Sequence, residues 1–271
     1  MIDALHTYLT EHVKGGVALA FSGGVDSTLL LHALLRLQKE KTFELTAYYF
    51  HTPLHTAEEK TEAIRTARDV GAELVELTFD PLQLPELRFN PTDRCYLCKG
   101  KIFSIMIGHA RARGLRVMMD GTNADDHRQY RPGLRALREL GVLSPLAEAG
   151  LAKADVRALA AEWGLSCAEK PSTPCLATRF DYGAELTADA VRRVEAGEAK
   201  LRRFYPHSSL RLRVHGTLAR LELPPELMSR ALTDAPRLLR ELRALGYHHI
   251  ALDLQGFRSG SMDEHLFQQA N

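Results

Sequence analysis

The N-terminal part of the chain contains six consecutive residues whose types and spacing suit the binding of an anion: Ser22, Gly23, Gly24, Val25, Asp26 and Ser27. The two glycines let the backbone approach a phosphate closely, because neither carries a Cβ atom. The two serine hydroxyls can donate hydrogen bonds, and the Asp26 carboxylate can hold a magnesium ion that bridges phosphate oxygens. The stretch has no Gly-Lys-Ser/Thr sequence and is therefore not a Walker A loop, in which a lysine reaches the phosphates.

The four cysteines form a second group with chemical potential. Cys95 and Cys98 make a Cys-x-x-Cys pair at the start of a predicted helix, whereas Cys175 stands alone in a loop with two prolines. Three thiolates would leave one iron of a 4Fe-4S cluster open for an exogenous ligand, whereas a structural zinc site usually takes four protein ligands. A redox pair at Cys95 and Cys98, or inert thiols, fits the same spacing. Cys167 is interpreted as a structural thiol.

The stretches around residues 22–27 predict the elements that position this loop. An apolar run over residues 16–21 leads into it and a leucine-rich run over residues 28–37 leads out, so a strand, a glycine turn and a helix N-terminus face the anion. Further strands are predicted over residues 45–50, 73–79 and 115–119, and helices over residues 1–14, 57–70, 95–113 and 153–163. This alternation indicates an α/β fold with a Rossmann-like parallel sheet.

Ligands of such sheets bind beyond the carboxyl ends of the strands. The loop over residues 22–27, Phe50 and the loop after residue 119 all follow predicted strands, and backbone groups near Phe50 are expected to meet the adenine. The third loop contributes further predicted nucleotide-binding residues: Gly121, Thr122, Asn123 and Asp125. Asp125 and Asp126 could hold metal or ribose, but helix capping fits them equally well.

The chain is predicted to form two domains, over residues 1–168 and 186–271, joined by a linker over residues 169–185 that carries Cys175. The second is expected to be a small α+β domain, with helices over residues 187–204 and 236–245 and strands over residues 209–214, 218–223 and 249–254.

Arginines of this second half are candidates for binding the anionic groups of a substrate. Arg211 and Arg213 are two residues apart on a predicted strand, so both side chains point to one face and could bind a phosphate. A solvated edge-strand face fits the same spacing. Arg179 lies four residues after Cys175 and could meet a carboxylate there. Cys175, Asp26 and Arg179 are the predicted catalytic residues.

Composition limits the partners that are expected. The 271 residues carry a net charge of +1, with 45% hydrophobic and 25% charged residues, which is ordinary for a soluble globular protein. Such a charge argues against a general nucleic-acid-binding surface. No targeting segment or membrane span is apparent, so a cytoplasmic protein without nucleic-acid or membrane partners is expected.

Residues 22–27, after a strand, resemble the PP-loop of N-type ATP pyrophosphatases, which split ATP into AMP and pyrophosphate and adenylate an oxygen of the substrate. Further stretches resemble the LarE family, the ATP-dependent sulfur transferases of nickel-pincer nucleotide cofactor assembly: residues 94–99, 120–126, 170–179, 211–216 and 252–258. The resemblance spans nearly the whole chain. It implies ATP and Mg²⁺ as cofactors and a small nucleotide, pyridinium-3,5-biscarboxylic acid mononucleotide, as substrate.

The resemblance also implies the course of the reaction. A carboxylate of the substrate is adenylated, and sulfur then displaces AMP to give a thiocarboxylate. In one variant of the family the cysteine matching Cys175 gives up its own sulfur and becomes dehydroalanine. In the other, three cysteines, here Cys95, Cys98 and Cys175, hold a 4Fe-4S cluster that binds and delivers an extra sulfide. The sacrificial type lacks the Cys-x-x-Cys pair, so the pair favours the cluster.

The family resemblance carries three weaker implications. Glu198 and Glu222 lie in stretches where the family has metal-binding acids, the chain is expected to form a homo-oligomer, and sulfide is supplied free or by a partner protein. Three other functions remain open. A tRNA-thiolating PP-loop enzyme usually has additional zinc-finger cysteine pairs, which four cysteines cannot supply. An amide-forming ligase leaves the cysteines unexplained, and a non-catalytic AMP-binding sensor would release no pyrophosphate.

Overall fold

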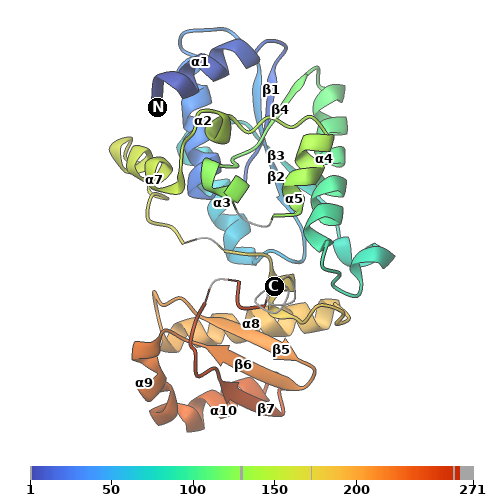
Figure 1. Ribbon diagram of the computed structural model, residues 1–271, viewed down its shortest axis with the longest axis vertical. Coiled ribbons are helices and arrows are strands. Elements are labelled where there is room, and N and C mark those ends of the chain that lie inside the picture. The colour runs from blue at the N-terminus through green and yellow to red at the C-terminus, as the bar shows by residue number, and fades with distance from the viewer. Residues whose placement is uncertain (1, 129–130, 172, 259, 263–271) are drawn as a thin grey trace. The chain divides into compact units, whose positions relative to one another are not determined.

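A computed structural model of the chain describes residues 2–128, 131–171, 173–258 and 260–262. Met1 of the first predicted helix and Ser172 of the predicted linker lie outside the described residues. The chain divides into two compact units (Figure 1). Unit 1 comprises Met1–Pro81 and Asp93–Thr173, and unit 2 comprises Leu82–Thr92 and Pro174–Asn271. Within the described residues, no helix is both long enough and apolar enough to cross a membrane.

Unit 1 is built on a four-stranded parallel sheet in the order β3-β2-β1-β4. Its strands are β1 (Val17–Ala20), β2 (Leu45–His51), β3 (Leu74–Thr78) and β4 (Val117–Met119). The central strand β1 is apolar and almost entirely buried, as expected for a parallel strand with helices on both faces. The predicted Rossmann-like α/β fold is therefore confirmed.

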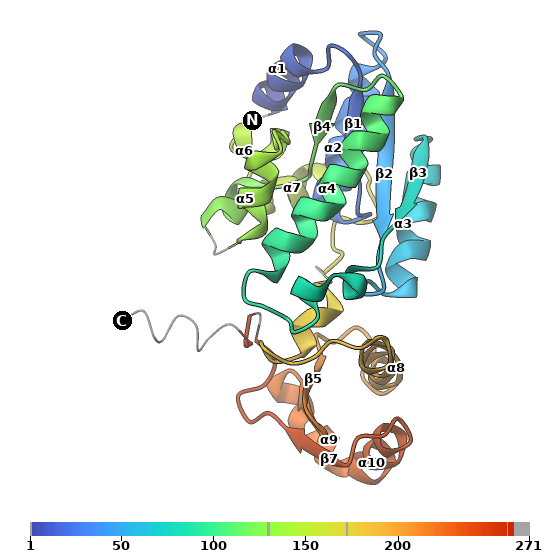
Figure 2. The ribbon, with the colours of Figure 1, turned by 90° about the vertical axis from the view of Figure 1, so that its right-hand side faces the viewer.

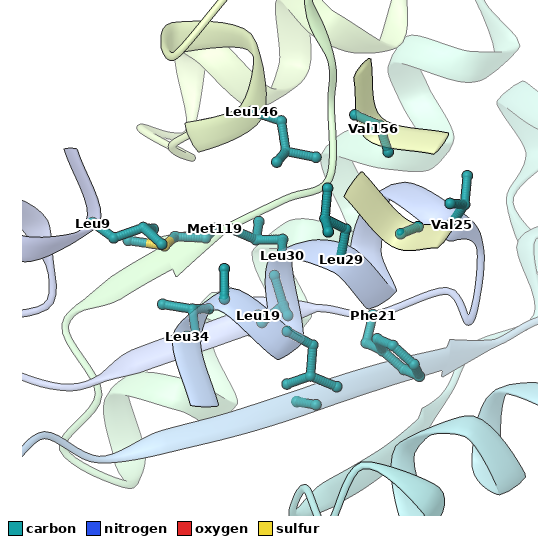
Figure 3. Packing of buried hydrophobic residues seen from close by; sticks show 14 of the residues in the cluster. Leu9, Leu19, Phe21, Val25, Leu29, Leu30, Leu34, Met119, Leu146 and Val156 are labelled. Atoms are coloured by element: carbon teal, nitrogen blue, oxygen red, sulfur yellow. The ribbon is translucent and has the colours of Figure 1, made fainter. Parts of the chain in front are cut away.

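Helices cover both faces of this sheet (Figure 2). They are α1 (Ile2–His12), α2 (Val25–Leu37), α3 (Ala57–Asp69), α4 (Arg94–Ala112), α5 (Gly133–Glu139), α6 (Pro145–Glu148) and α7 (Lys153–Glu162). Val17 and Leu19 of β1 pack in the cluster formed with α1, α2, α3, α6 and α7, part of which Figure 3 shows. Ala18, between them in the sequence, points to the other face, where α4 and α5 pack.

Unit 2 contains a mixed three-stranded sheet in the order β5-β6-β7, with one antiparallel and one parallel pair. Its strands are β5 (Arg211–His215), β6 (Leu218–Glu222) and β7 (His249–Leu252), and its helices are α8 (Ala188–Phe204), α9 (Met228–Thr233) and α10 (Ala235–Arg243). A Cβ atom on Gly197 of α8 would lie 2.5 Å from Leu212 Cδ2, so glycine lets α8 pack closely on β5. The predicted small α+β part of the fold is confirmed.

Residues 82–92, here called the crossing segment, belong to unit 2 although unit 1 sequence flanks them on both sides. The fully buried Asn90 side chain donates hydrogen bonds to the carbonyl oxygens of Ala177, Phe180 and Asp181, at 3.3, 3.1 and 2.9 Å. In addition, the N–H of Leu186 donates to a carbonyl of the crossing segment. Buried carbonyls need such donors, so the crossing segment stabilises the stretch that follows Cys175.

Short 3-10 helices complete the described structure: η1 (Pro81–Gln83), η2 (Pro85–Leu87), η3 (Ala124–Arg128), η4 (Leu176–Arg179) and η5 (Pro225–Leu227). The helices α5, α6 and α9, of four to seven residues each, were not predicted from the sequence. A helix of fewer than two turns shows too few apolar positions to define a period.

Candidate active site

The PP-loop, residues 22–27, joins β1 to α2 with backbone geometry that requires glycine. Gly23 has a φ of +70°, and a Cβ atom there would lie 2.7 Å from the Cα atom of Ala63 on α3. Gly24 is the extended N-cap of α2. The first turn of a helix leaves N–H groups without intrahelical partners, so the N-terminus of α2 suits an anion.

Serine hydroxyls hold the PP-loop in this shape. Ser27 Oγ accepts a hydrogen bond from the N–H of Ser22 and donates one to the carbonyl oxygen of Gly24, both at 3.2 Å. Ser22 Oγ lies 3.0 Å from Ser27 Oγ and accepts from the N–H of Gly24 at 3.3 Å. The loop is therefore ordered by its own side chains before a ligand binds.

Replacing Gly23 by alanine is expected to lower the free energy of unfolding by about 1–3 kcal/mol and to abolish ATP-dependent pyrophosphate release. The new Cβ atom would meet backbone that no rotamer change can move. Gly71→Ala is the matched control, because Gly71 has a φ of +73° but a Cβ atom there would have no neighbour within 4 Å. Urea unfolding and a pyrophosphate assay would measure both variants. Equal losses of activity in the two would contradict the importance of the close contact with α3.

The loop after β4, residues 120–126, packs directly on the PP-loop and is here called the nucleotide loop. A Cβ atom on Gly121 would lie 2.8 Å from the backbone nitrogen of Ser27. Asn123 Nδ2 donates to Asp26 Oδ1 at 3.0 Å, which joins the two predicted nucleotide-binding loops. The structure therefore brings Asp26, Gly121 and Asn123 together, as their positions after parallel strands predicted.

Other predicted residues of this loop are occupied with internal contacts. Thr122 is buried and donates to the Asp120 carboxylate through both its N–H and its hydroxyl. Asp126 accepts from the N–H of Asn123 at 3.0 Å and pairs with Arg131 at 2.9 Å. Asp125 accepts from the N–H of Lys153 at 2.9 Å. These carboxylates organise the nucleotide loop in this structure.

Lys153, the first residue of α7, is a residue at this site that the sequence analysis missed. Its Nζ atom lies 2.5 Å from Asp26 Oδ2. No spacing rule links Lys153 to a glycine loop 127 residues earlier, because the contact depends on how α7 packs on α2.

Phe50, at the end of β2, has its side chain in the core with α4. An adenine would therefore meet the backbone of Phe50 or its neighbours.

The Cys-x-x-Cys pair lies in the first two turns of α4. Cys95 is exposed and Cys98 is half-buried, and neither forms a disulfide with another described residue. A Cβ atom on Gly133 would lie 3.3 Å from the carbonyl oxygen of Cys95 and 2.7 Å from Lys99 Cδ, so α5 packs tightly on these turns. Cys167 is 5% exposed within the apolar core of unit 1, which agrees with its interpretation as a structural thiol.

In unit 2, Arg179 organises the stretch that carries Cys175. Its side chain is fully buried and forms two hydrogen bonds to the Glu198 carboxylate, at 2.8 and 3.1 Å. The remaining nitrogen donates at 2.9 Å to both the carbonyl oxygen of Pro174 and the hydroxyl of Thr178. The carboxylate that Arg179 contacts here is thus one of the protein's own, and its meeting a substrate carboxylate stays a prediction.

Glu198 is the acceptor at the centre of this group. It also accepts from Arg202 at 3.0 Å and from the N–H of Leu212 on β5 at 3.2 Å. Burial alone would raise the pKa of the Glu198 carboxyl, but the hydrogen bonds and charge of Arg179, with Arg211 and Arg202, hold that pKa below its usual value. Glu198 is therefore ionised in the folded protein.

Arg211 and Arg213 of β5 differ in their surroundings, since Arg213 makes internal contacts whereas Arg211 lies among other arginines. Arg213 is 4% exposed and contacts Glu222 at 2.9 Å, the hydroxyl of Ser261 at 2.9 Å and the carbonyl oxygen of Thr178 at 2.9 Å. Burial, with the neighbouring positive charge of Arg179, lowers the pKa of Arg211 to about 10, so it is still protonated at neutral pH. An added anion near Arg211 would relieve this crowding of positive charge.

The acids predicted to bind a metal do not fit one in this structure. Glu198 and Glu222 are both fully buried, and arginines contact both carboxylates. A cation would have to displace those guanidinium groups from sites with no access to water. Within either unit, the described residues contain no group of three or more His, Cys, Asp or Glu side chains arranged to hold a metal ion.

Comparison with known proteins agrees with this arrangement. A family model of the PP-loop domain matches residues 2–79, which include the PP-loop, β1, β2 and β3. The chain is 38% identical over 251 residues to the pyridinium-3,5-bisthiocarboxylic acid mononucleotide synthase of Lactiplantibacillus plantarum, covering 92% of this chain and 90% of that one. The chain belongs to the LarE family.

Two further relatives extend over the same length. An uncharacterised protein of Synechocystis sp. is 35% identical over 250 residues, covering 92% of each chain. An uncharacterised protein of Methanocaldococcus jannaschii is 29% identical over 243 residues, covering 90% of this chain and 91% of that one. Membership of the LarE family, with the PP-loop domain, makes this chain an ATP-dependent enzyme.

Proposed function

We propose that the chain is a sulfur transferase that uses ATP to activate a carboxylate of pyridinium-3,5-biscarboxylic acid mononucleotide and then replaces a carboxylate oxygen by sulfur. The observation that carries this proposal is the 38% identity, over 92% of the chain, to an enzyme named for the bisthiocarboxylic acid product. A PP-loop in one unit and a half-exposed cysteine in the other supply groups for the two half-reactions.

The activation half-reaction is assigned to unit 1. A carboxylate is a poor electrophile because its leaving group would be oxide, and adenylation supplies a better one. The N–H groups at the start of α2, with Gly23 and Gly24, would hold the pyrophosphate, and Asp26 would hold Mg²⁺. Gly121, Asn123 and Asp125 would line the nucleotide.

The sulfur-transfer half-reaction is assigned to the cysteines. None of Cys95, Cys98 and Cys175 is buried, and three cysteine thiolates are the kind of donors that a 4Fe-4S cluster takes. Such a cluster, when bound by three cysteines, offers an open iron position for an exogenous sulfide. Cys175 is half-exposed at the start of η4, and its carbonyl accepts hydrogen bonds from Thr178 and Arg179, which hold its backbone in place.

A second route uses Cys175 as a sacrificial donor. Its thiolate would attack the acyl adenylate and release AMP, forming a thioester. Removal of the Cys175 Cα proton would then break the Cβ–S bond, leaving the thiocarboxylate on the substrate and dehydroalanine in the chain. The Cys-x-x-Cys pair of α4 has no part in this route, and its presence favours the cluster.

In unit 2, Arg211 is proposed to bind the phosphate of the substrate, and Arg213, the other residue predicted for this role, to support the site. Arg211 is half-buried, stacks 5.2 Å from the ring of Phe257 and lies among other guanidinium groups. Arg213 would act chiefly by keeping Thr178 and Glu222 in place, since its contacts are internal. A homo-oligomer, a sulfide donor protein and a cytoplasmic location stay predictions.

The test is to purify the protein without oxygen and supply ATP, Mg²⁺, sulfide and the biscarboxylate substrate. The expected result is a brown protein with iron and sulfide in similar amounts that forms thiocarboxylate over many turnovers, with one pyrophosphate released for each. An iron-free protein that loses the mass of hydrogen sulfide at Cys175 after one turnover would establish the sacrificial route. Pyrophosphate release without thiocarboxylate would exclude sulfur transfer, and the absence of both would favour a sensor.

A further inference from the structure

Lys153 reaches the PP-loop from outside it. Its Nζ atom lies 2.5 Å from Asp26 Oδ2, and the two side chains are 34% and 21% exposed. The backbone of Lys153 is fixed separately, because its N–H donates to Asp125 Oδ2 at 2.9 Å. Asp155 accepts from the N–H of Ala152 at 2.9 Å and caps the same end of α7. The lysine side chain can therefore move while its Cα atom stays in place.

Both oxygens of Asp26 are occupied. Oδ1 accepts from Asn123 at 3.0 Å, and Oδ2 pairs with Lys153. A magnesium ion on Asp26 would need one of these oxygens as a ligand. An ammonium group and Mg²⁺ repel each other at contact distance, so the metal and Lys153 cannot share Oδ2. Binding of Mg²⁺ to Oδ2 thus requires Lys153 to leave that oxygen.

The phosphates of a bound nucleotide are the group that a released Lys153 would contact. The PP-loop itself contains serines, glycines, a valine and an aspartate but no cation. Phosphate oxygens favour charged donors, and a lysine has three rotatable N–H groups on a flexible stem. Pyrophosphate departure concentrates negative charge on these oxygens, so a cation there would stabilise the leaving group.

We propose that Lys153 is the phosphate-binding lysine of this PP-loop. It neutralises Asp26 when the site holds no nucleotide, and it transfers to the β- and γ-phosphates when Mg²⁺ and nucleotide bind together. This inference rests on the proposed role of Asp26 in holding Mg²⁺. A Walker A loop carries its lysine within the loop, whereas here α7 supplies it.

The first experiment measures binding of α,β-methylene-ATP, in which the bond to be cleaved is replaced, and of AMP, by calorimetry with Mg²⁺ present. Lys153→Met is expected to weaken binding of the ATP analogue by about 10- to 100-fold and that of AMP by less than about threefold. Lys153→Arg should restore part of the affinity. Lys41→Met, which removes an equal charge from an exposed position of unit 1, should change neither.

The second experiment titrates each protein with Mn²⁺ alone, detected by electron paramagnetic resonance. Lys153→Met should bind Mn²⁺ several-fold more tightly than wild type, because no ammonium group competes for Asp26.

Equal loss of analogue and AMP affinity, or unchanged affinity for both, would overturn the assignment of Lys153 as the phosphate-binding lysine. Unchanged Mn²⁺ affinity would overturn the proposal that Lys153 leaves Asp26 when the metal binds. If analogue binding by wild type does not depend on Mg²⁺ and Asp26→Asn leaves it unchanged, the proposed role of Asp26 fails, whatever Lys153→Met does.

Discussion

Replacing Cys175 by alanine is expected to reduce thiocarboxylate formation to below about 1% of wild type while pyrophosphate release stays within about threefold. The loop is held through the carbonyl oxygen of Cys175, which accepts from Thr178 at 2.8 Å and from Arg179 at 3.4 Å. Alanine keeps that carbonyl, so the variant loses the sulfur and little of the loop structure. The adenylation proposed for the PP-loop of unit 1 needs no thiol, so ATP should still be cleaved.

The controls for this variant are the other cysteines, assayed with labelled sulfide and with a pyrophosphate assay in the same reaction. Cys167→Ala should retain both activities, because Cys167 is buried in the core of unit 1. Cys95→Ala should lose sulfur transfer if the cluster route operates and keep a single turnover if Cys175 is the sacrificial donor. Thiocarboxylate made by Cys175→Ala over many turnovers would show that Cys175 has neither role.

Replacing Arg179 by methionine is expected to lower the free energy of unfolding by about 3–5 kcal/mol, because it leaves the buried Glu198 carboxylate without its main partner. Sulfur transfer should also be lost, since the variant removes the donors to the Pro174 carbonyl and to Thr178. Urea unfolding and the thiocarboxylate assay would measure the two effects. Arg202→Met is the matched control: Arg202 is 35% exposed, so its loss should cost less than about 1 kcal/mol.

A double variant, Arg179→Met with Glu198→Leu, separates stability from loop positioning. Replacing both members of a buried ion pair with apolar residues is often nearly neutral, so the double variant should regain most of the lost stability. It should not regain sulfur transfer, because the loop donors are still missing. Recovery of both would mean that Arg179 acts only through stability.

The same pair makes a definite prediction for pH. The pKa of Glu198 is lower in the folded protein than in the unfolded chain, so its contribution to stability is complete above the unfolded value of about 4.3. That contribution is lost as the pH falls from there through the lower folded value. Glu198→Gln should therefore flatten the dependence of unfolding free energy on pH in that acid range, measured by urea unfolding at several pH values. An unchanged slope would contradict the lowered pKa.

The sequence could predict the parts of the fold that repeat a pattern. The buried strand β1 is a continuous apolar run and α2 a leucine-rich one, so strand, PP-loop and helix were recognisable together. The strands and helices of the second half were also recognisable from the spacing of their apolar residues, which predicted a small α+β unit. The nucleotide loop was placed correctly beside the PP-loop because parallel strands share a carboxyl edge.

The parts that the sequence did not indicate depend on contacts between distant residues. Lys153 reaches Asp26 over 127 positions, and the buried Arg179 pairs with Glu198. Such pairings are set by the packing of α7 on α2 and of η4 on α8, for which a single sequence carries no periodic signal. The crossing segment likewise joins unit 2 through contacts with distant residues, among them the hydrogen bonds of the buried Asn90 amide.

The crossing segment limits where the gene of this protein can be cut or recombined without damage to unit 2. A gene fragment that starts at residue 174 would encode the sheet of unit 2 without the Asn90 amide, leaving carbonyls after Cys175 without their donors. A recombination event with a single breakpoint would therefore damage unit 2 rather than transfer it. Unit 2, which carries Cys175, is not a detachable module, and new combinations of the two units would need breakpoints on both sides of residues 82–92 as well.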